Sequence, residues 1–281
     1  EAVGHPVAVN PNRKLARIAA ALERLSPGTA PKADWLAAPA YVWDGAARAV
    51  EQILAPRLAL LKGIDAQKEV VRANVERLAR GAAAHDMLLW GARGMGKSAL
   101  LRSAVLAAQE TVPGALALIQ IAPDALASLP ALFGALRGVE RRFLVYIDDL
   151  GFEDGDSTGP RALRSWLEGG VEARPANVRI AVTSNRRAIV ARHLSEQDDP
   201  INPRDAVDDR LALADRFGLS IGFHNCTQDD YLAIIAGYCG ELGLAFEEGE
   251  ALEWSKRRGA RSGRVAWQFV TELAGRAGKP L

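Results

Sequence analysis

The chain has 281 residues, of which 49% are hydrophobic and 25% charged, and its formal net charge is +1. This length allows one large domain or two small ones and is sufficient to bury a substantial core. The near-neutral charge excludes a global attraction to nucleic acid or anionic membranes, so any such binding requires a local patch. Because no apolar run approaches the roughly 18 residues of a membrane-spanning helix and no secretory pattern opens the sequence, we expect a cytoplasmic protein without membrane contact.

The first 56 residues differ in character from the rest of the chain. Asn12 can cap a short amphipathic helix that runs to about Leu25. From there to about Pro56 the sequence mixes prolines with tryptophan and tyrosine and is too apolar for a free linker. We therefore expect residues 1–56 to form a helix and an extended arm laid over a surface, separate from the domains that follow.

Alternating strand and helix patterns occupy the middle of the chain. Helical patterns cover Asp65–Arg80 and Ser98–Glu110. Short apolar runs of the kind found in buried parallel strands lie at Asp86–Trp90, Ala115–Ile121, Phe143–Ile147, Val178–Thr183 and Leu219–Phe223. Strands that alternate with helices imply an α/β fold, with a parallel sheet flanked by helices. We assign this fold to residues 57–223.

The last part of the chain is predicted to be entirely helical. Thr227 and Asp230 form a capping box at the start of an apolar helix. Two more helices are expected at about 248–258 and 263–274. Residues 224–281 should therefore form a small helical domain after the sheet.

Residues 91–98 form a glycine-rich motif between a predicted strand and a predicted helix. They read Gly-Ala-Arg-Gly-Met-Gly-Lys-Ser, which fits the Walker A pattern G-x-x-x-x-G-K-[ST] of P-loop nucleotide-binding proteins. The glycines let backbone N–H groups face phosphate oxygens, Lys97 can reach the β- and γ-phosphates of ATP, and Ser98 can bind Mg²⁺. The predicted nucleotide contacts in this stretch are Gly91, Ala92, Arg93, Gly94, Met95, Gly96, Lys97, Ser98 and Ala99.

Two carboxylates, Asp148 and Asp149, follow the apolar run Phe143–Ile147. They would lie at the carboxyl end of a strand, where α/β sheets bind their ligands. We interpret this run as a Walker B motif. Asp148 is predicted to hold Mg²⁺ through water, together with Ser98, and Asp149 to orient or deprotonate the water that attacks the γ-phosphate.

Asn185 ends the next apolar run along the chain. If the sheet has the usual P-loop order, this side chain lies between the two motifs and can hydrogen-bond the γ-phosphate or the attacking water. The alternative is that Asn185 simply caps the helix that follows.

These motifs together resemble the AAA+ ATPase family from about Leu60 to the carboxyl terminus. The segment Leu60–Asp65 looks like the part of that family that lies against adenine, which implies nucleotide contacts at Gly63 and Ile64. Asn185 matches the family's sensor 1 position. The helical carboxy-terminal domain corresponds to the family's lid.

Two arginines acquire roles from the same resemblance. The segment from Leu213 to Gly218 is similar to the one that carries the arginine finger in bacterial replication initiators and in the Holliday-junction branch-migration motor, which makes Arg216 the candidate finger. Arg264 aligns with the arginine of the lid's sensor 2 motif. A planar guanidinium suits the spread charge of a transferring phosphoryl group. Because a finger acts across a subunit boundary, the resemblance also implies a homo-oligomer.

Asp149 departs from the commonest AAA+ pattern, in which a glutamate follows the Walker B aspartate. A paired aspartate also occurs in replication initiators and helicase loaders, so hydrolysis is still implied, although the shorter side chain could slow it.

Longer strings resemble an uncharacterised bacterial family of predicted AAA+ ATPases. They are Leu-Leu-Trp-Gly-Ala-Arg-Gly, which ends at Gly94, Thr-Ser-Asn-Arg-Arg, which ends at Arg187, and Ser262–Phe269. That resemblance implies ATP/ADP and Mg²⁺ as ligands and brings no known substrate. We expect Mg²⁺-dependent ATP hydrolysis coupled to remodelling or loading of an unknown protein or nucleic-acid partner.

Two alternatives remain open from the sequence. The first is a nucleotide-gated switch or loader with little intrinsic hydrolysis, which Asp149 keeps plausible. The second is a P-loop kinase, against which the arginine-bearing segments count. A basic run formed by Lys256, Arg257, Arg258 and Arg261 could serve phosphate, a neighbouring subunit or nucleic acid, and the sequence does not choose among them.

Overall fold

The computed structural model describes residues 33–122, 124–150, 167, 174–185 and 215–281. The chain divides into two compact units, Glu1–Asp34 and Trp35–Leu281. The helix expected from Asn12 to Leu25 lies outside the described residues. In the described ranges, no helix is both long and apolar enough to cross a membrane.

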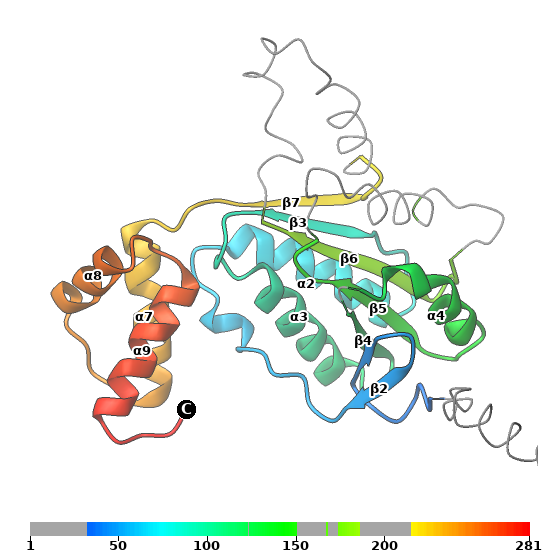
Figure 1. Ribbon diagram of the computed structural model, residues 1–281, viewed down its shortest axis with the longest axis horizontal. Helices are drawn as coiled ribbons and strands as arrows, with labels where there is room; N and C mark the ends of the chain where they lie inside the picture. The colour runs from blue at the N-terminus through cyan, green and yellow to red at the C-terminus, as the bar shows by residue number, and fades with distance from the viewer. Residues whose placement is uncertain (1–32, 123, 151–166, 168–173, 186–214) are drawn as a thin grey trace, which may run out of the picture. The chain divides into compact units, whose positions relative to one another are not determined.

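A seven-stranded sheet forms the centre of the second unit, with the strand order β2-β1-β4-β5-β6-β3-β7 (Figure 1). Its strands are β1 (Ala40–Trp43), β2 (Ala47–Val50), β3 (Met87–Gly91), β4 (Leu116–Ile121), β5 (Arg142–Ile147), β6 (Val178–Ser184) and β7 (Leu219–Phe223). All neighbouring strands are parallel except β1 and β2. The predicted parallel α/β sheet is confirmed, and each of the five predicted apolar runs forms one of its strands.

Strands β1 and β2 correct the expectation of a separate arm. They form a hairpin, and β1 pairs in parallel with β4, so that Ala40 lies opposite Leu118. Tyr41 and Trp43 are buried, and Trp35 packs against both Tyr41 and Phe143. The aromatic residues that made this stretch too apolar for a linker therefore belong to the core of the sheet unit. The boundaries at residues 57 and 224 stay a proposal.

Helices α2 (Asp65–Ala79) and α3 (Lys97–Thr111) pack side by side (Figure 1). Both were predicted from the spacing of their apolar residues, and α3 buries Leu100, Leu101 and Val105 completely. A shorter helix, α4 (Leu129–Leu136), connects β4 to β5 and has a proline in its first turn, where its lack of an N–H costs nothing. Helix α3 begins directly at the end of the glycine-rich motif.

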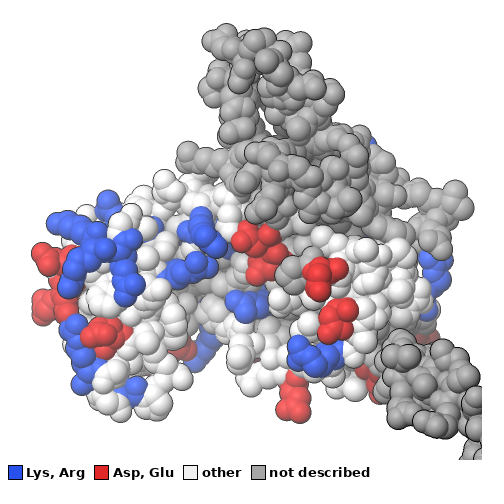
Figure 2. Space-filling model, in the orientation of Figure 1, with Lys and Arg blue, Asp and Glu red and all other residues white. Residues whose placement is uncertain are grey.

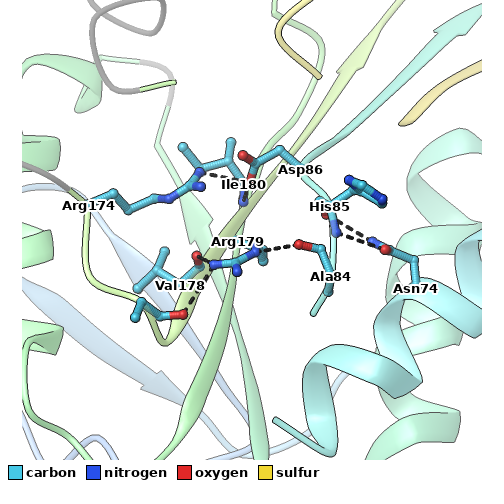
Figure 3. Close-up of polar contacts among 9 residues, drawn as sticks. Asn74, Ala84, His85, Asp86, Arg174, Val178, Arg179 and Ile180 are labelled. Atoms are coloured by element: carbon cyan, nitrogen blue, oxygen red, sulfur yellow. Dashed lines mark hydrogen bonds and ion pairs between the residues drawn. The ribbon is translucent and has the colours of Figure 1, made fainter. Parts of the chain in front are cut away.

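A polar network fastens the starts of β3 and β6, at the ends of these strands that are remote from the glycine-rich motif (Figure 3). Asp86 accepts hydrogen bonds of 2.7 Å from Arg174 and from the backbone N–H of Ile180. Asn74 of α2 both donates to the carbonyl and accepts from the N–H of His85. The network therefore ties the start of β3 to β6 and to helix α2.

The carboxy-terminal part contains α7 (Gln228–Leu242), α8 (Glu248–Arg257) and α9 (Gly263–Arg276). The predicted capping box is present, since Thr227 accepts from the N–H of Asp230 and the Asp230 carboxylate accepts from the N–H of Thr227. Helix α7 packs against α9, and α8 also contacts α9 (Figure 1). We call this helical part the lid.

Candidate nucleotide-binding site

The glycine-rich motif links β3 to α3 through backbone that only glycine adopts readily. Gly91, Gly94 and Gly96 have φ angles of 119°, 77° and 91°. A Cβ on Gly91 would lie 2.1 Å from the carbonyl oxygen of Phe223 in β7. The motif therefore favours glycine at these positions. The N–H of Ala92 donates to the carbonyl of Phe223, and the remaining N–H groups of the loop are the ones that a phosphate could engage.

Lys97 is held inside this loop. Its side chain is only 5% exposed, and Nζ donates hydrogen bonds of 2.9 Å to the carbonyls of Gly91 and Ala92 and to Oδ1 of Asn185. Burial lowers the pKa of the ammonium group, whereas the carboxylates of Asp149 and Asp148 oppose that shift. Lys97 is thus a desolvated cation, and such a cation interacts more strongly with an arriving phosphate than one in water does.

Asp148 lies between the glycine-rich motif and β6. One carboxylate oxygen, Oδ1, accepts hydrogen bonds of 2.7 Å from both Ser98 and Thr183. Burial alone would raise the pKa of Asp148, but hydrogen bonding to Tyr146, Thr183 and Ser98 outweighs it and holds the pKa below its ordinary value. Asp148 is therefore an ionised carboxylate next to the Ser98 hydroxyl, as the predicted Mg²⁺ site requires.

Asp149 occupies an uncommon backbone conformation beside Asn185. Among the described residues it is the one non-glycine with a positive φ, at 49°, a region that aspartate and asparagine tolerate better than most residues. Its carboxylate accepts a hydrogen bond from Nδ2 of Asn185, and its N–H donates to the hydroxyl of Thr183 at 2.9 Å. The conformation turns Asp149 away from the strand direction and towards Asn185.

The order of the sheet brings these groups together. Strand β6 lies between β3, which leads into the glycine-rich motif, and β5, which leads into Asp148. Asn185, at the end of β6, therefore lies between the two motifs, as its predicted role required. Thr183, two residues earlier on β6, bridges Asp148 to the backbone of Asp149. Its role was not predicted, although its place at the end of an apolar run next to Ser184 and Asn185 was the available signal.

Tyr146 is a second site residue that sequence reasoning missed. It is 1% exposed, and strand alternation places it on the same face of β5 as Asp148. Its hydroxyl makes no hydrogen bond of normal geometry to the described residues, yet it lies near enough to Asp148 to lower the pKa of that carboxyl. Burial in turn raises the pKa of Tyr146, so the phenol stays protonated and able to donate.

A cavity of about 1030 Å³ opens over these residues. It is lined by most of the predicted site, namely Arg93, Gly94, Met95, Gly96, Lys97, Ser98, Ala99, Asp148, Asp149, Asn185 and Arg264. Ile64 also lines it and so, unforeseen from the sequence, do the segment Leu54–Arg57 and Tyr238 and Trp267 of the lid. A cavity with charged groups and apolar or aromatic side chains in its wall suits a ligand that joins phosphates to a flat ring.

Three predicted nucleotide contacts do not line this cavity. Gly91 and Ala92 instead turn their carbonyls to Lys97. Gly63 has a φ of 74°, and the carboxylate of Asp230 packs where a Cβ would be, at 2.7 Å. Gly63 therefore seats the first turn of α7 against the sheet domain and contributes to the site indirectly.

The lid meets the glycine-rich motif through the start of α9. Ser262 caps this helix by accepting from the N–H of Val265 at 3.2 Å, and the N–H of Arg264 donates to the carbonyl of Gly94 at 3.3 Å. The Arg264 side chain is exposed on the cavity and lowers the pKa of Lys97 by its charge. A phosphate placed between the two cations would relieve that repulsion.

Arg216 is not among the residues that line the cavity. It is half-buried and comes shortly before β7, which pairs with β3 at the edge of the sheet. The finger role assigned to it requires a second subunit, and it stays a prediction.

The sheet order, the glycine-rich loop followed by α3, and the helical lid define a P-loop protein of the AAA+ type. The chain belongs to the family described as "Protein of unknown function (DUF815)", which matches residues 36–277.

Solved structures show the same fold at low sequence identity. The Holliday junction branch migration motor RuvB of Thermotoga maritima is 17% identical, with a TM-score of 0.53 over 81% of this chain and 68% of that one. The Orc1 protein of Aeropyrum pernix, solved in complex with DNA, is 14% identical, with a TM-score of 0.56 over 81% and 66%. The FIGL-1 AAA domain in complex with ADP is 17% identical, with a TM-score of 0.51 over 80% and 75%. No curated protein matches the sequence significantly.

Proposed function

We propose that this protein binds ATP with Mg²⁺ and hydrolyses it to remodel or load a macromolecular partner, acting as a homo-oligomer in the cytoplasm. One observation carries the proposal: Lys97, Asn185 and Asp149 form a hydrogen-bonded chain along the wall of the cavity. It joins a buried cation, which suits the γ-phosphate, to a carboxylate, which suits the attacking water.

The residues around Asp148 fit a magnesium ion. Mg²⁺ usually takes only one or two protein oxygens and completes its shell with water and phosphate. Ser98 and Asp148 offer a hydroxyl and an ionised carboxylate whose oxygens lie 2.7 Å apart next to the glycine-rich loop. A bound Mg²⁺ would neutralise charge on the β- and γ-phosphates, while Thr183 holds the Asp148 carboxylate in place.

The lid supplies the remaining contacts in this proposal. Arg264 would meet the γ-phosphate together with Lys97, and the apolar and aromatic side chains of the cavity wall, such as Ile64, Tyr238 and Trp267, would hold the base. Because the N–H of Arg264 donates a hydrogen bond to the carbonyl of Gly94, nucleotide bound in the loop would also affect the position of the lid.

A switch with slow hydrolysis is the second candidate, and one observation favours it. In this structure Asn185 occupies Oδ1 of Asp149, so proton transfer from water must use the other carboxylate oxygen or wait until that contact loosens. If this step is slow, the protein would remain in its ATP-bound state until a partner releases Asp149.

Direct measurement of ATP binding and turnover separates these cases. Titration of a fluorescent ATP analogue into wild type and Lys97→Ala tests the site, and phosphate release tests hydrolysis. We expect wild type to bind in the presence of Mg²⁺ and Lys97→Ala to bind at least about tenfold more weakly. Failure of wild type to bind any adenine nucleotide would refute the proposal, whereas binding without turnover would support the switch.

A further inference from the structure

A group of cations covers the part of the lid where α8 ends and α9 begins. Lys256, Arg257, Arg258 and Arg261 are all exposed, and we call them the lid cation cluster. Figure 2 shows lysine and arginine side chains gathered over the lid. Since the whole chain has a net charge of only +1, the cluster is a local concentration of positive charge, and its field is not that of a generally basic protein.

The cluster lacks carboxylate partners within the described residues. Other arginines of the same unit do pair, such as Arg57 with Glu241 at 2.8 Å and Arg276 with Glu250. Among the described residues Glu253, one helical turn before Arg257, forms no ion pair with it, and Arg261 donates a hydrogen bond of 3.4 Å to the neutral Gln228. The positive charge of the cluster is therefore available to an external anion.

Trp254 orders two of the four side chains. The guanidinium carbons of Arg258 and Arg257 lie 4.9 Å and 6.0 Å from the centroid of its ring, within cation–π range. The ring itself packs against Phe269 of α9, with centroids 5.8 Å apart. A stacked guanidinium keeps its N–H donors for phosphate oxygens, and its reduced freedom lowers the entropy lost on binding.

The basic surface continues to the nucleotide site. Shortly after Arg261 in the sequence, Ser262 and Arg264 contact Gly94 of the glycine-rich loop. The residue before Gly94 is the exposed Arg93. A polyanion on the lid cation cluster would therefore bind beside the element that senses nucleotide.

We propose that the lid cation cluster binds the phosphate backbone of a nucleic acid without reading its bases. The exposed large apolar side chains of the described chain are Leu36, Leu54, Val70, Trp267 and Leu281, and the two of these on the lid, Trp267 and Leu281, line the nucleotide cavity. A protein partner would need an apolar centre to its interface, whereas a phosphate backbone needs only spaced cations. Trp254 is half-buried, packs on Phe269 and already stacks with two guanidinium groups, which favours contacts to phosphate over stacking of a base.

This inference deepens the proposed function by naming the class of partner, and it rests on that function only for its biological meaning. The test is fluorescence anisotropy of labelled single-stranded and duplex DNA of about 20 nucleotides or base pairs, with nucleotide-free protein. Contacts to about four phosphates predict a slope of log affinity against log salt of about −3 to −4, which is a loss of roughly a hundredfold between about 50 and 200 mM salt.

Charge reversal locates the binding surface. The double variant Lys256→Glu/Arg261→Glu breaks no ion pair with a described residue and should lower affinity at least about tenfold while flattening the salt slope. The control, Arg48→Glu/Arg80→Glu, makes the same change in net charge at exposed positions of β2 and the end of α2, and should stay within about twofold of wild type.

Three results would overturn the proposal. They are no DNA binding by wild type at low salt, equal losses in the two double variants, and a change in self-association without any DNA binding, which would assign the cluster to a contact between copies of this chain. Because binding is measured without ATP, a failure of hydrolysis leaves this test unaffected.

Discussion

Lys97 and Asn185 are joined by a hydrogen bond of 2.9 Å between Nζ and Oδ1. The amide nitrogen of the same asparagine donates to Asp149, so one side chain contacts both the cation proposed to meet the γ-phosphate and the carboxylate proposed to meet water. An arriving phosphate would compete for the Lys97 ammonium and free the amide oxygen. Asn185 would thereby transmit the presence of the γ-phosphate to Asp149.

The first prediction concerns Asn185→Ala. ATP should still bind within about threefold of wild type, because Lys97 keeps its two backbone carbonyls and the loop is intact. Turnover should fall about 10- to 100-fold, because Asp149 and the water lose the group that orients them. Titration with a fluorescent ATP analogue and a phosphate-release assay measure the two effects. Gln228→Ala, which removes an exposed amide from the lid, should leave both unchanged.

Two substitutions of Asp149 separate the role of its carboxylate in turnover from the effect of its backbone conformation on stability. Asparagine tolerates a φ of 49° as well as aspartate does, so Asp149→Asn should unfold at nearly the wild-type temperature while turnover falls about 100-fold or more. Asp149→Ala should lose a similar amount of activity and, in addition, about 1 kcal/mol of stability, because alanine is disfavoured in this conformation. Normal turnover by Asp149→Asn would remove this residue from the proposed chemistry.

Gly91 is predicted to be indispensable for folding of the loop. In Gly91→Ala the new Cβ would lie 2.1 Å from the carbonyl oxygen of Phe223 at a φ of 119°, so β7 must shift or the loop must change shape. Chemical denaturation should show a loss of about 3 kcal/mol or more. The matched control is Gly240→Ala, at an exposed helical position with open space around it, which should be neutral or stabilising by up to about 1 kcal/mol.

Tyr146→Phe tests whether the buried hydroxyl positions Asp148. A hydroxyl that positions Asp148 would, when removed, raise the Mg²⁺ concentration needed for half-maximal ATP binding by about tenfold. Stability should be nearly unchanged, because the hydroxyl makes no complete hydrogen bond within the described residues. Tyr41→Phe should lower stability and leave the Mg²⁺ requirement unchanged. The Tyr41 hydroxyl accepts a hydrogen bond of 3.1 Å from the N–H of Ala38, and its strand lies two strands away from β5 in the sheet. An unaltered Mg²⁺ requirement in Tyr146→Phe would leave the tyrosine with a packing role alone.

The strands and helices that carry the motifs were predictable because their signals are local. Strand β3, the glycine-rich turn and α3 follow one another in the sequence, and the capping box of α7 can be recognised from Thr227 and Asp230 alone. Strands β1 and β2 were missed because each has only four residues, and because β1 joins the sheet by pairing with β4, in which Leu118 lies opposite Ala40. Helix α4 was missed because its proline suggests a break, although proline is favourable in a first turn.

The candidate site likewise contains residues that the sequence predicts and residues that it does not. Lys97, Ser98 and Asp148 belong to motifs whose spacing specifies their chemistry, and the structure brings them together. The contribution of Tyr146 arises from strand alternation and depth, and that of Tyr238 and Trp267 from packing of the lid against the sheet domain. None of these leaves a pattern in the sequence that distinguishes it from an ordinary core residue.

ATP hydrolysis by mixtures of two inactive variants shows whether Arg216 of one subunit completes the nucleotide site of another. Lys97→Ala should lose the nucleotide site but keep Arg216, and Arg216→Ala should keep the site but lose the proposed finger. Each variant alone should turn over at least about 100-fold more slowly than wild type, and mixing them should restore a substantial fraction of activity, because some subunit boundaries then combine an intact site with an intact finger. If Lys97→Ala alone hydrolysed ATP at the wild-type rate, the proposed nucleotide site would be wrong.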